Sequence, residues 1–418
     1  MHHPKSRPAH ILFIVENNTV PTDVRVWKEA KTARKNGYDV SIIAPKSKVF
    51  CKKYEVIDGI HIYRHPAFNN GRGKIGQLLE YATACLWESI LSWRVFFEKR
   101  FDIIHSANPP DHVFLIAKVF RPFGVRFVFD HHDLAPELFL AKFGSRQNLF
   151  YRLLILMERY SCRSADAVIS TNESYKRIVL RRHGLRPESV FIVRNDPEVE
   201  AEPTRPIPRE ASIGGPTKLL YVGSINNQDG VDLLIKSLHL LVRQLRQTKI
   251  HCTVIGDGDH LKSVRRLCDE LGIGSFLTFT GYIHHRRIVK EYIAEADICL
   301  ETAPDNEANR KSTFIKVMEY MLAGKPVVAF DLDETRFTLQ NSGLLVAPNR
   351  LDHFANAIQK LIEDPSERRR LGEMARSRIL DGLNWSNAAR EMIRAYNYTE
   401  SRLPRNPVLL KNSPVDGL

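Results

Sequence analysis

Short apolar runs alternate with amphipathic stretches along the first 197 residues. The run at 11–15 ends in polar residues, a helical pattern over 23–35 follows and closes at Gly37, and the next run begins at Val40. Further apolar runs come at similar spacing, at 101–105, 126–130, 165–170 and 190–193. Strands separated by amphipathic helices are the sequence form of βαβ units, so residues 1–197 are predicted to form an α/β domain with a parallel sheet.

A segment without apolar periodicity interrupts this alternation. Residues 198–217 read EVEAEPTRPIPREASIGGPT, with four prolines and a Gly-Gly pair, which is typical of a linker. The alternation then restarts and predicts a second α/β domain over 218–383, a helix over 384–398 that crosses back to the first domain, and a tail over 399–418. Because ligands bind beyond the carboxyl ends of parallel strands, the expected site is a cleft between two doubly wound domains.

Positive charge is concentrated in the first half. Residues 1–197 hold 31 of the 61 Lys and Arg but only 19 of the 48 Asp and Glu, which gives this half a formal charge of +12 and leaves +1 for the rest. A surplus confined to one domain indicates an anionic partner. The charge alone leaves open whether that partner is nucleic acid, a membrane surface or a phosphorylated substrate.

The cysteines and the apolar runs argue against a disulfide-rich, exported or membrane-spanning protein. The six cysteines are far apart, with no CxxC pair and no Cys/His cluster at zinc spacing, so we expect buried thiols in a reducing cytoplasm. The basic start leads into an apolar run too short for a signal peptide. No stretch reaches the ~18 apolar residues that span a bilayer, so any membrane contact is expected to be peripheral.

The segment 301–330, ETAPDNEANRKSTFIKVMEYMLAGKPVVAF, carries the most chemistry. A strand ends near Leu300, a polar loop follows, and Ser312 and Thr313 predict the cap of a helix that runs to Leu322. A helix N-terminus has free N–H groups and the positive end of the helix dipole, both suited to a phosphate. Positive charge at this end is supplied by Arg310, Lys311 and Lys316.

Two residues of this predicted helix suit a nucleotide. Lys316 and Glu319 are three residues apart and so share one helix face. A cation that meets a phosphate and a carboxylate that meets a sugar hydroxyl fit a nucleoside diphosphate. The plain alternative is a capped surface helix with one intrahelical Lys–Glu pair.

Several motifs point to a known family. The chain closely resembles the bacterial family 4 glycosyltransferases in the segments STFIKVMEYMLAGKPVVAFDLDETR, ADAVISTNESYKRIVLRRHG, FIVRNDP, YVGSINNQDGVDLLIKSL, VIGDGDHLKSVRRLCDELG and FTGYI. It looks most like the branch that builds surface polysaccharides and lipid-linked oligosaccharides. The resemblance implies the GT-B fold of two Rossmann-like domains, a UDP- or GDP-linked sugar donor held by the C-terminal domain, an acceptor held by the N-terminal one, and retention of anomeric configuration. It implies no required metal and no cofactor.

On the donor side, the resemblance gives Glu319 the role of the carboxylate that holds the ribose hydroxyls. Tyr282 and Ile283 stand where the backbone of the family meets the nucleobase. The carboxylate that contacts the donor sugar in the family, eight residues before Glu319, is replaced here by Lys311.

The first loop of the second domain also departs from the family pattern. Gly223 ends the first strand, but the Arg and Lys that many members aim at the diphosphate are Ser224 and Asp229 here. Lys316, with its basic neighbours before the helix, is therefore the candidate to neutralise the leaving diphosphate.

In the first domain, FVFDHHDLAPELF places two histidines and two carboxylates directly after a strand. The resemblance aligns His132 with the histidine that the family sets between donor sugar and acceptor. Asp133 is expected to orient the imidazole or contact the acceptor, and Glu137 to do likewise or to cap the next helix. Asn18 falls in the loop where the family approaches the donor phosphate, and Arg25, just beyond it, is assigned to the acceptor side.

Two mechanisms give retention. A double inversion needs a carboxylate nucleophile, whereas in front-face attack the departing phosphate takes the proton of the acceptor. Because Lys311 stands at the expected carboxylate position, we expect front-face attack, with Asp305 and Glu307 as the remaining candidate nucleophiles. Lys316 would stabilise charge on the leaving oxygen.

An apolar stripe lies within residues 72–101, beside basic residues. Its members at helical spacing are Ile75, Leu78, Leu79, Ala82, Leu86, Ile90, Trp93 and Phe97. Such a stripe suits an anionic membrane surface, but a core helix packed on the sheet is favoured for most of it. With the +12 charge, the resemblance implies a peripheral enzyme at the cytoplasmic face of a membrane, acting on a lipid-linked or glycan acceptor.

Three other functions remain open. A GT-B nucleotide-sugar epimerase or hydrolase would use the same donor site, and donor turnover without a lipid acceptor would favour it. A catalytically degenerate GT-B subunit is compatible with Lys311, Ser224 and Asp229. A nucleic-acid-binding protein is suggested by the charge alone, and without a recognition helix, an aromatic RNP set or a zinc finger no nucleic acid is expected.

Overall fold

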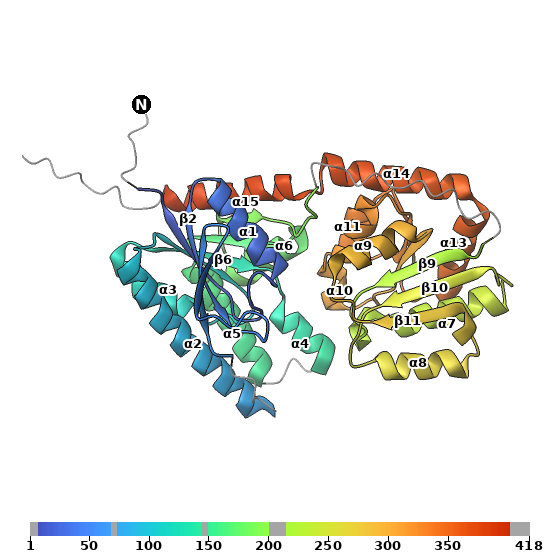
Figure 1. Ribbon diagram of the computed structural model, residues 1–418, viewed down its shortest axis with the longest axis horizontal. Helices are drawn as coiled ribbons and strands as arrows, with labels where there is room; N and C mark the ends of the chain where they lie inside the picture. Colours follow the sequence, from blue (N-terminus) through green and yellow to red (C-terminus); the bar gives the residue numbers. More distant parts are fainter. Residues whose placement is uncertain (1–6, 68–72, 144–148, 200–214, 402–418) are drawn as a thin grey trace, which may run out of the picture.

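The chain folds into two α/β domains, each built on a parallel sheet with helices packed around it (Figure 1). The computed structural model describes residues 7–67, 73–143, 149–199 and 215–401. The predicted fold class is confirmed, because both sheets have the strand order of a doubly wound α/β fold.

The N-terminal sheet has eight strands in the order β3-β4-β2-β1-β5-β6-β7-β8, parallel except for the β3–β4 pair. Its winding reverses between β1 and β5, which is where ligands bind in such sheets. The strands are β1 (His10–Ile14), β2 (Asp39–Pro45), β3 (Tyr54–Ile57), β4 (Ile60–His65), β5 (Ile103–Ala107), β6 (Arg126–His131), β7 (Ala167–Ser170) and β8 (Val190–Ile192). The helices are α1 (Val24–Lys35), α2 (Gly73–Glu98), α3 (Phe114–Phe120), α4 (Ala135–Phe143), α5 (Leu149–Ser164) and α6 (Glu173–His183).

The C-terminal sheet has six parallel strands in the order β11-β10-β9-β12-β13-β14, with the reversal between β9 and β12. The strands are β9 (Thr217–Val222), β10 (Ile250–Ile255), β11 (Leu277–Gly281), β12 (Ile298–Glu301), β13 (Val327–Phe330) and β14 (Leu344–Val346). The helices are α7 (Val231–Arg243), α8 (Leu261–Glu270), α9 (Arg286–Glu295), α10 (Glu307–Lys311), α11 (Ile315–Leu322), α12 (Asp333–Leu339), α13 (Leu351–Glu363) and α14 (Pro365–Asp381).

The last helix, α15 (Trp385–Glu400), runs from the C-terminal domain across the N-terminal one (Figure 1). Asn384 begins it by accepting a hydrogen bond from the N–H of Asn387 at 3.2 Å. Met392 and Tyr396 are fully buried in the same core cluster as Phe13 of β1. The end of the chain therefore completes the core of the first domain.

The apolar stripe predicted on residues 72–101 lies on α2, and most of its described members are exposed, contrary to the core position favoured for most of the stripe. The buried residues of α2 include Ala84, Ser92 and Val95, and Trp93 of the stripe packs against the core cluster of the N-terminal domain. The stripe members at 75, 78 and 79 lie outside the residues whose side chains are described. Its later members include the exposed Leu86, Ile90 and Phe97. None of the described helices is long and apolar enough to cross a membrane.

Side chains that follow the strands of each sheet hold the two domains together. In the N-terminal domain Asn172, after β7, donates from Nδ2 to the carbonyl of Lys311 at 2.8 Å and to Oγ1 of Thr313 at 3.1 Å. Glu334 of α12 accepts from the N–H of Ser174 at 3.3 Å and lies 3.6 Å from Arg194. The strand ends of the two domains therefore meet, as the GT-B prediction requires.

Candidate active site

A buried ion-pair network positions the histidine loop after β6. Arg25, in the first turn of α1, donates from Nε and Nη2 to the two carboxylate oxygens of Asp130, each at 2.8 Å. Asp130 also lies 3.2 Å from Nδ1 of His132. The helix begins at this point because Asp23 caps it, accepting a hydrogen bond from the N–H of Val26 at 3.0 Å. Local capping thus places Arg25 against the end of β6.

The backbone of the same loop is held by Asn108, which follows β5. Its Oδ1 accepts hydrogen bonds from the N–H groups of His132 at 2.8 Å and Asp133 at 3.0 Å, and its Nδ2 donates to the carbonyl of Asp133 at 2.9 Å. The side chains of His132 and Asp133 are 17% and 42% exposed. Because Nδ1 faces Asp130, Nε2 is the ring nitrogen of His132 that is turned toward Asp133, 4.0 Å away.

Burial and charge act in opposite directions on this cluster. Burial lowers the pKa of His132, but the hydrogen bond to Asp130 and its charge outweigh burial and raise that pKa above 6.5. Burial raises the pKa of Asp130, but the charges and hydrogen bonds of Arg25 and His132 together outweigh burial, and the net shift is downward. Glu29, 3.1 Å from Nη2 of Arg25, has a raised pKa because it is fully buried. The network therefore keeps Asp130 ionised beside His132.

Two residues near β1, Arg25 and Asn18, differ in exposure. Arg25 is only 5% exposed, and its remaining Nη1 donates to the carbonyl of Val193 at 3.1 Å. It therefore acts through Asp130 and does not present its charge to an acceptor. Asn18 is exposed in the loop after β1, and its Oδ1 accepts a hydrogen bond from the N–H of Thr19 at 2.9 Å.

Glu137 and Lys311 meet at the interface between the domains. Glu137, on α4, is buried and forms an ion pair with Arg182 of α6. Nζ of Lys311, at the end of α10, lies 3.8 Å from Glu137 and 3.1 Å from Glu307. Lys311 of the C-terminal domain thus joins the two domains.

The ammonium group of Lys316 is fixed at the end of β9. Nζ of Lys316 lies 2.7 Å from Oε2 of Glu301 and donates to the hydroxyl of Tyr221 at 3.0 Å. Burial lowers the pKa of Lys316, but the buried carboxylate of Glu301 outweighs it and the pKa is raised. A Cβ at Gly223, where φ is +156°, would lie 2.9 Å from the lysine Nζ. Glycine here lets the ammonium approach the backbone where the strand ends.

Ser224 and Asp229 both make hydrogen bonds in the loop that follows β9. The carbonyl of Ser224 accepts a hydrogen bond from the hydroxyl of Tyr221 at 2.9 Å. Asp229 accepts from the N–H of Asn226 at 2.9 Å and forms a reciprocal capping box with it. The side chain of Asp229 therefore stabilises the turn before α7.

The predicted helix start at Ser312 and Thr313 is wrong. α11 begins at Ile315, and its N-cap, Phe314, makes no side-chain capping bond. Ser312 instead ends the short helix α10, and Thr313 bonds Asn172 of the other domain. Because Thr313 bonds to the other domain, it does not cap α11 as the local sequence predicts. The first N–H groups of α11 therefore have no side-chain cap.

Glu319 lies one turn beyond Lys316 on α11 and forms an ion pair with Arg286, the first residue of α9. Burial raises the pKa of Glu319 despite the charge of Arg286. Sequence reasoning missed Arg286, whose signal is its place shortly after Tyr282 and Ile283. Tyr282 is exposed, and Ile283 packs against the domain core.

The remaining candidates near α10 are also paired. Arg310, which is exposed, forms an ion pair with Asp305, just as Lys311 does with Glu307. Both carboxylates considered as nucleophiles therefore have a basic partner on α10.

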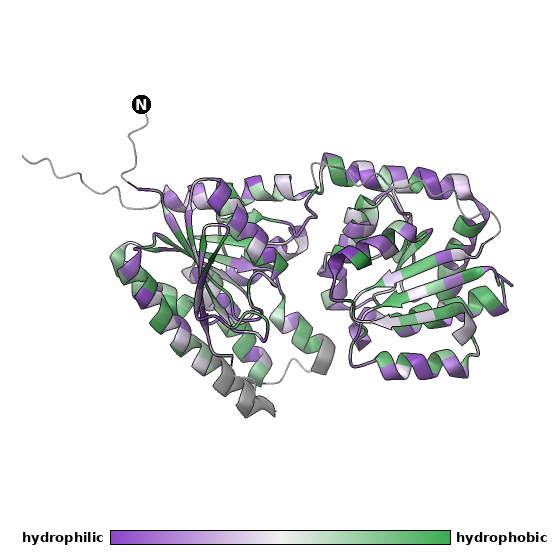
Figure 2. Ribbon diagram, in the orientation of Figure 1, coloured by the Kyte–Doolittle hydropathy of each residue, from purple (hydrophilic) through white to green (hydrophobic). Residues whose placement is uncertain are grey.

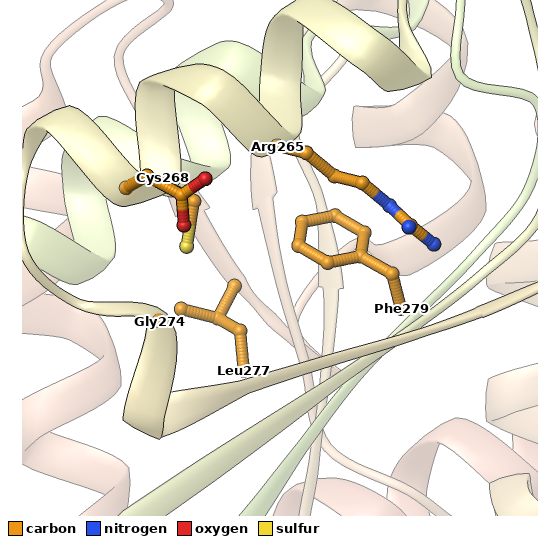
Figure 3. Close-up of a pocket in the computed structure, with 6 residues that line it drawn as sticks. Arg265, Cys268, Gly274, Leu277 and Phe279 are labelled. Atoms are coloured by element: carbon orange, nitrogen blue, oxygen red, sulfur yellow. The ribbon is translucent and has the colours of Figure 1, made fainter.

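A pocket of about 350 Å³ lies elsewhere on the C-terminal domain (Figure 3). It opens between α8 and the segment 274–279, and Phe279 and Arg265 line it together with Leu277 and Cys268. None of the candidate residues for transfer lines this pocket.

Comparisons with known proteins agree with this architecture. Residues 23–195 match the family described as Glycosyltransferase Family 4, and residues 216–364 match Glycosyl transferases group 1. An uncharacterised glycosyltransferase of Methanocaldococcus jannaschii is 24% identical over 375 residues, which cover 85% of this chain and 88% of that protein.

Two solved structures share the fold over nearly their whole length. Sucrose-phosphate synthase from Thermosynechococcus elongatus superposes with a TM-score of 0.72 at 20% identity, covering 94% of this chain and 99% of that one. The Anabaena protein HepE, solved in complex with UDP-glucose, has a TM-score of 0.66 at 14% identity over 93% and 99% of the two chains. The chain is therefore a glycosyltransferase with the GT-B fold, similar to family 4 in its N-terminal domain and to the group 1 enzymes in its C-terminal domain.

Proposed function

We propose that this enzyme transfers a sugar, with retention of configuration, from a UDP- or GDP-linked donor to a lipid-linked or polysaccharide acceptor in cell-surface glycan synthesis. The observation that carries the proposal is the face of α11, where Lys316 lies beside Gly223 and Glu319 follows one turn later. The fold shared with a protein solved with UDP-glucose supports a nucleotide-sugar donor.

Incubation with a labelled donor, with and without a lipid-linked acceptor, tests the reaction. Transfer that depends on the acceptor, with the donor's anomeric configuration in the product, supports the proposal. Donor turnover of equal rate without acceptor would instead favour the epimerase or hydrolase. Absence of both, with the donor still bound, would indicate a degenerate subunit.

Glu319→Gln is expected to weaken donor binding by about 10–150-fold, the equivalent of losing hydrogen bonds to a charged group worth about 1.5–3 kcal/mol. Melting curves with UDP-, GDP- and ADP-sugars identify the donor, because a ligand that binds only the folded chain raises Tm. Titration of that donor then compares Kd in wild type and variant.

The matched control is Glu291→Gln. Glu291 also forms an ion pair with an arginine of α9, Arg287, at 3.0 Å. This variant is expected to bind the donor like wild type. Equal affinity in wild type and Glu319→Gln would remove Glu319 from the donor site.

Charge stabilisation is the central requirement of the transfer step. As the bond between the anomeric carbon and the diphosphate oxygen breaks, negative charge develops on the diphosphate, and fixed positive groups stabilise it. In this proposal, Lys316 and the first N–H groups of α11 supply that positive charge. Glu301 already neutralises part of the charge of Lys316. The N–H groups of α11 therefore supply more of the stabilisation of the diphosphate than they would beside an unpaired lysine.

Front-face attack fits the residues around the donor. The acceptor oxygen forms the new bond to the anomeric carbon on the side from which the diphosphate leaves, and its proton passes to a departing phosphate oxygen. His132 would bond the reacting sugar or the acceptor hydroxyl through Nε2, with Asp133 beside it. Asp305 and Glu307, the alternative nucleophiles, are each held by a basic neighbour.

An exposed apolar surface supports a membrane-bound acceptor. We call it the outer face: the exposed apolar residues of α2, α3 and α5, which include Leu86, Ile90, Phe97, Leu115, Val119, Leu153 and Leu156. Phe114 of α3 stacks on Tyr160 of α5 at 5.8 Å, and Lys118 lies over both rings. Figure 2 shows hydrophobic residues recurring along α2 and α3. Apolar patches flanked by cations suit an anionic membrane surface.

The variant Leu86→Glu/Ile90→Glu is expected to bind anionic vesicles about 100-fold more weakly, because two large apolar side chains no longer leave water, a loss of about 3 kcal/mol. Co-sedimentation with phosphatidylglycerol vesicles measures the partition coefficient. The control, Met374→Glu/Leu380→Glu, alters two exposed apolar residues of α14 on the other domain and is expected to partition like wild type. Equal partition of both variants would remove the outer face from the proposal.

A further inference from the structure

Two glutamates and two histidines from four separate elements meet inside the N-terminal domain. Glu16 follows β1, His65 ends β4, Glu88 lies on α2, and His112 follows β5. Nε2 of His65 is 3.0 Å from Oε2 of Glu16, and Nε2 of His112 is 2.6 Å from Oε2 of Glu88. One ligand atom from each of Glu16, His65 and Glu88 lies within 4.8 Å of the other two. The mechanism proposed above uses none of these groups.

The ring of His65 is oriented so that its Nε2 needs a cation. Its Nδ1 lies 3.1 Å from the carbonyl oxygen of Pro66, which can only accept, so Nδ1 carries a proton. In the neutral ring Nε2 then presents a lone pair to the carboxylate of Glu16. His65 and Glu88 are buried, and within the described part of the chain Oε2 of Glu16 and Oε1 of Glu88 have no hydrogen-bond donor. A second proton or a metal ion must fill this position.

We propose that Glu16, His65 and Glu88 bind a divalent transition-metal ion, with zinc as the reference ion. Imidazole and carboxylate ligands suit such ions, at distances of about 2.0–2.2 Å, and three protein ligands leave a fourth position for water. The carbonyl of Pro66 and the imidazole of His112 then hold His65 and Glu88 in place, as outer-shell partners of metal ligands do. The ion ties α2, which carries much of the outer face, to the ends of β1 and β4.

A second cluster in the N-terminal domain also combines two carboxylates with a histidine, but it already holds a cation. Glu29, His105 and Asp130 also bring one ligand atom each within 4.8 Å of the others. There the guanidinium of Arg25 already lies 2.8 Å from Asp130 and 3.1 Å from Glu29. A cation of the chain itself occupies that cluster, which makes it the matched control.

The test uses the full chain without an affinity tag. Wild type is treated with a chelator, dialysed and given Zn²⁺ or Co²⁺ alone, and bound metal is measured by mass spectrometry and by the visible absorption of Co²⁺. We expect one ion per chain and a Tm several degrees higher than that of the chelated protein. His65→Gln and Glu88→Gln are expected to lose the ion, and His105→Gln to retain it.

A wild-type chain that binds no metal and whose Tm is unchanged by chelation or by Zn²⁺ would overturn the proposal and assign two buried protonated pairs to the cluster. Metal retained in both His65→Gln and Glu88→Gln would overturn it as well. The wild-type measurement decides the question even where a variant fails to fold. Because metal content and Tm are read without donor or acceptor, this test is independent of the proposed transfer reaction.

Discussion

Replacing His132 by glutamine is expected to lower kcat by about 10²–10⁴-fold, the range typical of a side chain that holds or moves a proton at a reacting group. His132 is partly exposed at the carboxyl edge of the N-terminal sheet, and its ring is fixed by Asp130 at 3.2 Å. Glutamine keeps a hydrogen-bonding group but neither the ring geometry nor the titratable proton. Steady-state kinetics with saturating donor and acceptor measure the change, and the Kd of the donor is expected to stay near the wild-type value.

Two comparisons make this result specific. His353→Gln changes a half-exposed histidine of α13 that is paired with Asp352 and is expected to leave kcat unchanged. Asp130→Asn removes the charge that raises the pKa of His132, so any limb of the pH–kcat profile that His132 sets is expected to move to lower pH. A His132→Gln enzyme with wild-type kcat would place the chemistry elsewhere.

Replacing Asp130 by asparagine is expected to destabilise the folded chain by about 3–5 kcal/mol, because a buried ion pair then loses one partner and leaves the other charge uncompensated. Asp130 is fully buried, and Arg25 donates two hydrogen bonds to it at 2.8 Å. Urea denaturation followed by circular dichroism measures the free energy of unfolding.

The controls for this prediction separate burial from charge. Asp133→Asn alters a carboxylate 42% exposed in the same loop and is expected to change stability by less than about 0.5 kcal/mol. In the double variant Arg25→Met/Asp130→Asn the uncompensated cation is gone, so part of the lost stability is expected to return. An Asp130→Asn chain as stable as Asp133→Asn would contradict the network described above.

The pair of His132 and Asp130 makes part of the stability of the fold depend on pH. The folded-state pKa of His132 lies above its ordinary value of 6.5, because Asp130 outweighs the opposing effect of burial. A group whose pKa rises on folding stabilises the fold fully below its unfolded pKa and loses that contribution as the pH rises through the folded pKa. Asp130→Asn is therefore expected to cost more stability at a pH below 6.5, where His132 is protonated in both states, than at alkaline pH above its folded-state pKa.

Much of the fold follows from local patterns. The apolar run at 126–130 became β6, the helical pattern over 23–35 became α1, and the proline-rich segment separates the two sheets. The outward turn of the α2 stripe was not predictable, because a buried Glu88 on the sheet side breaks the rule that the apolar face is the core face. Its partner His112 lies 24 positions away, and nothing local signals that pairing.

In the candidate site, too, local features were predictable and contacts between distant residues were not. Helical spacing alone places Lys316 and Glu319 on one face of α11. The cap predicted from Ser312 and Thr313 failed, because Asn172 of the other domain holds Thr313. Arg286 was missed because its partner Glu319 is 33 positions distant.

The sequence by itself determined the order of strands and helices, the two α/β domains and the shared helix face of Lys316 and Glu319, because hydrophobic period and helical spacing act over a few residues. The tertiary structure alone decided the partners: Arg25 with Asp130, 105 positions apart, Lys316 with Glu301, and Glu16 with His65. The physical reason is that the carboxyl ends of parallel strands share one edge of a sheet. Which side chains meet there depends on strand order, and strand order is set by packing of the whole chain rather than by spacing along it.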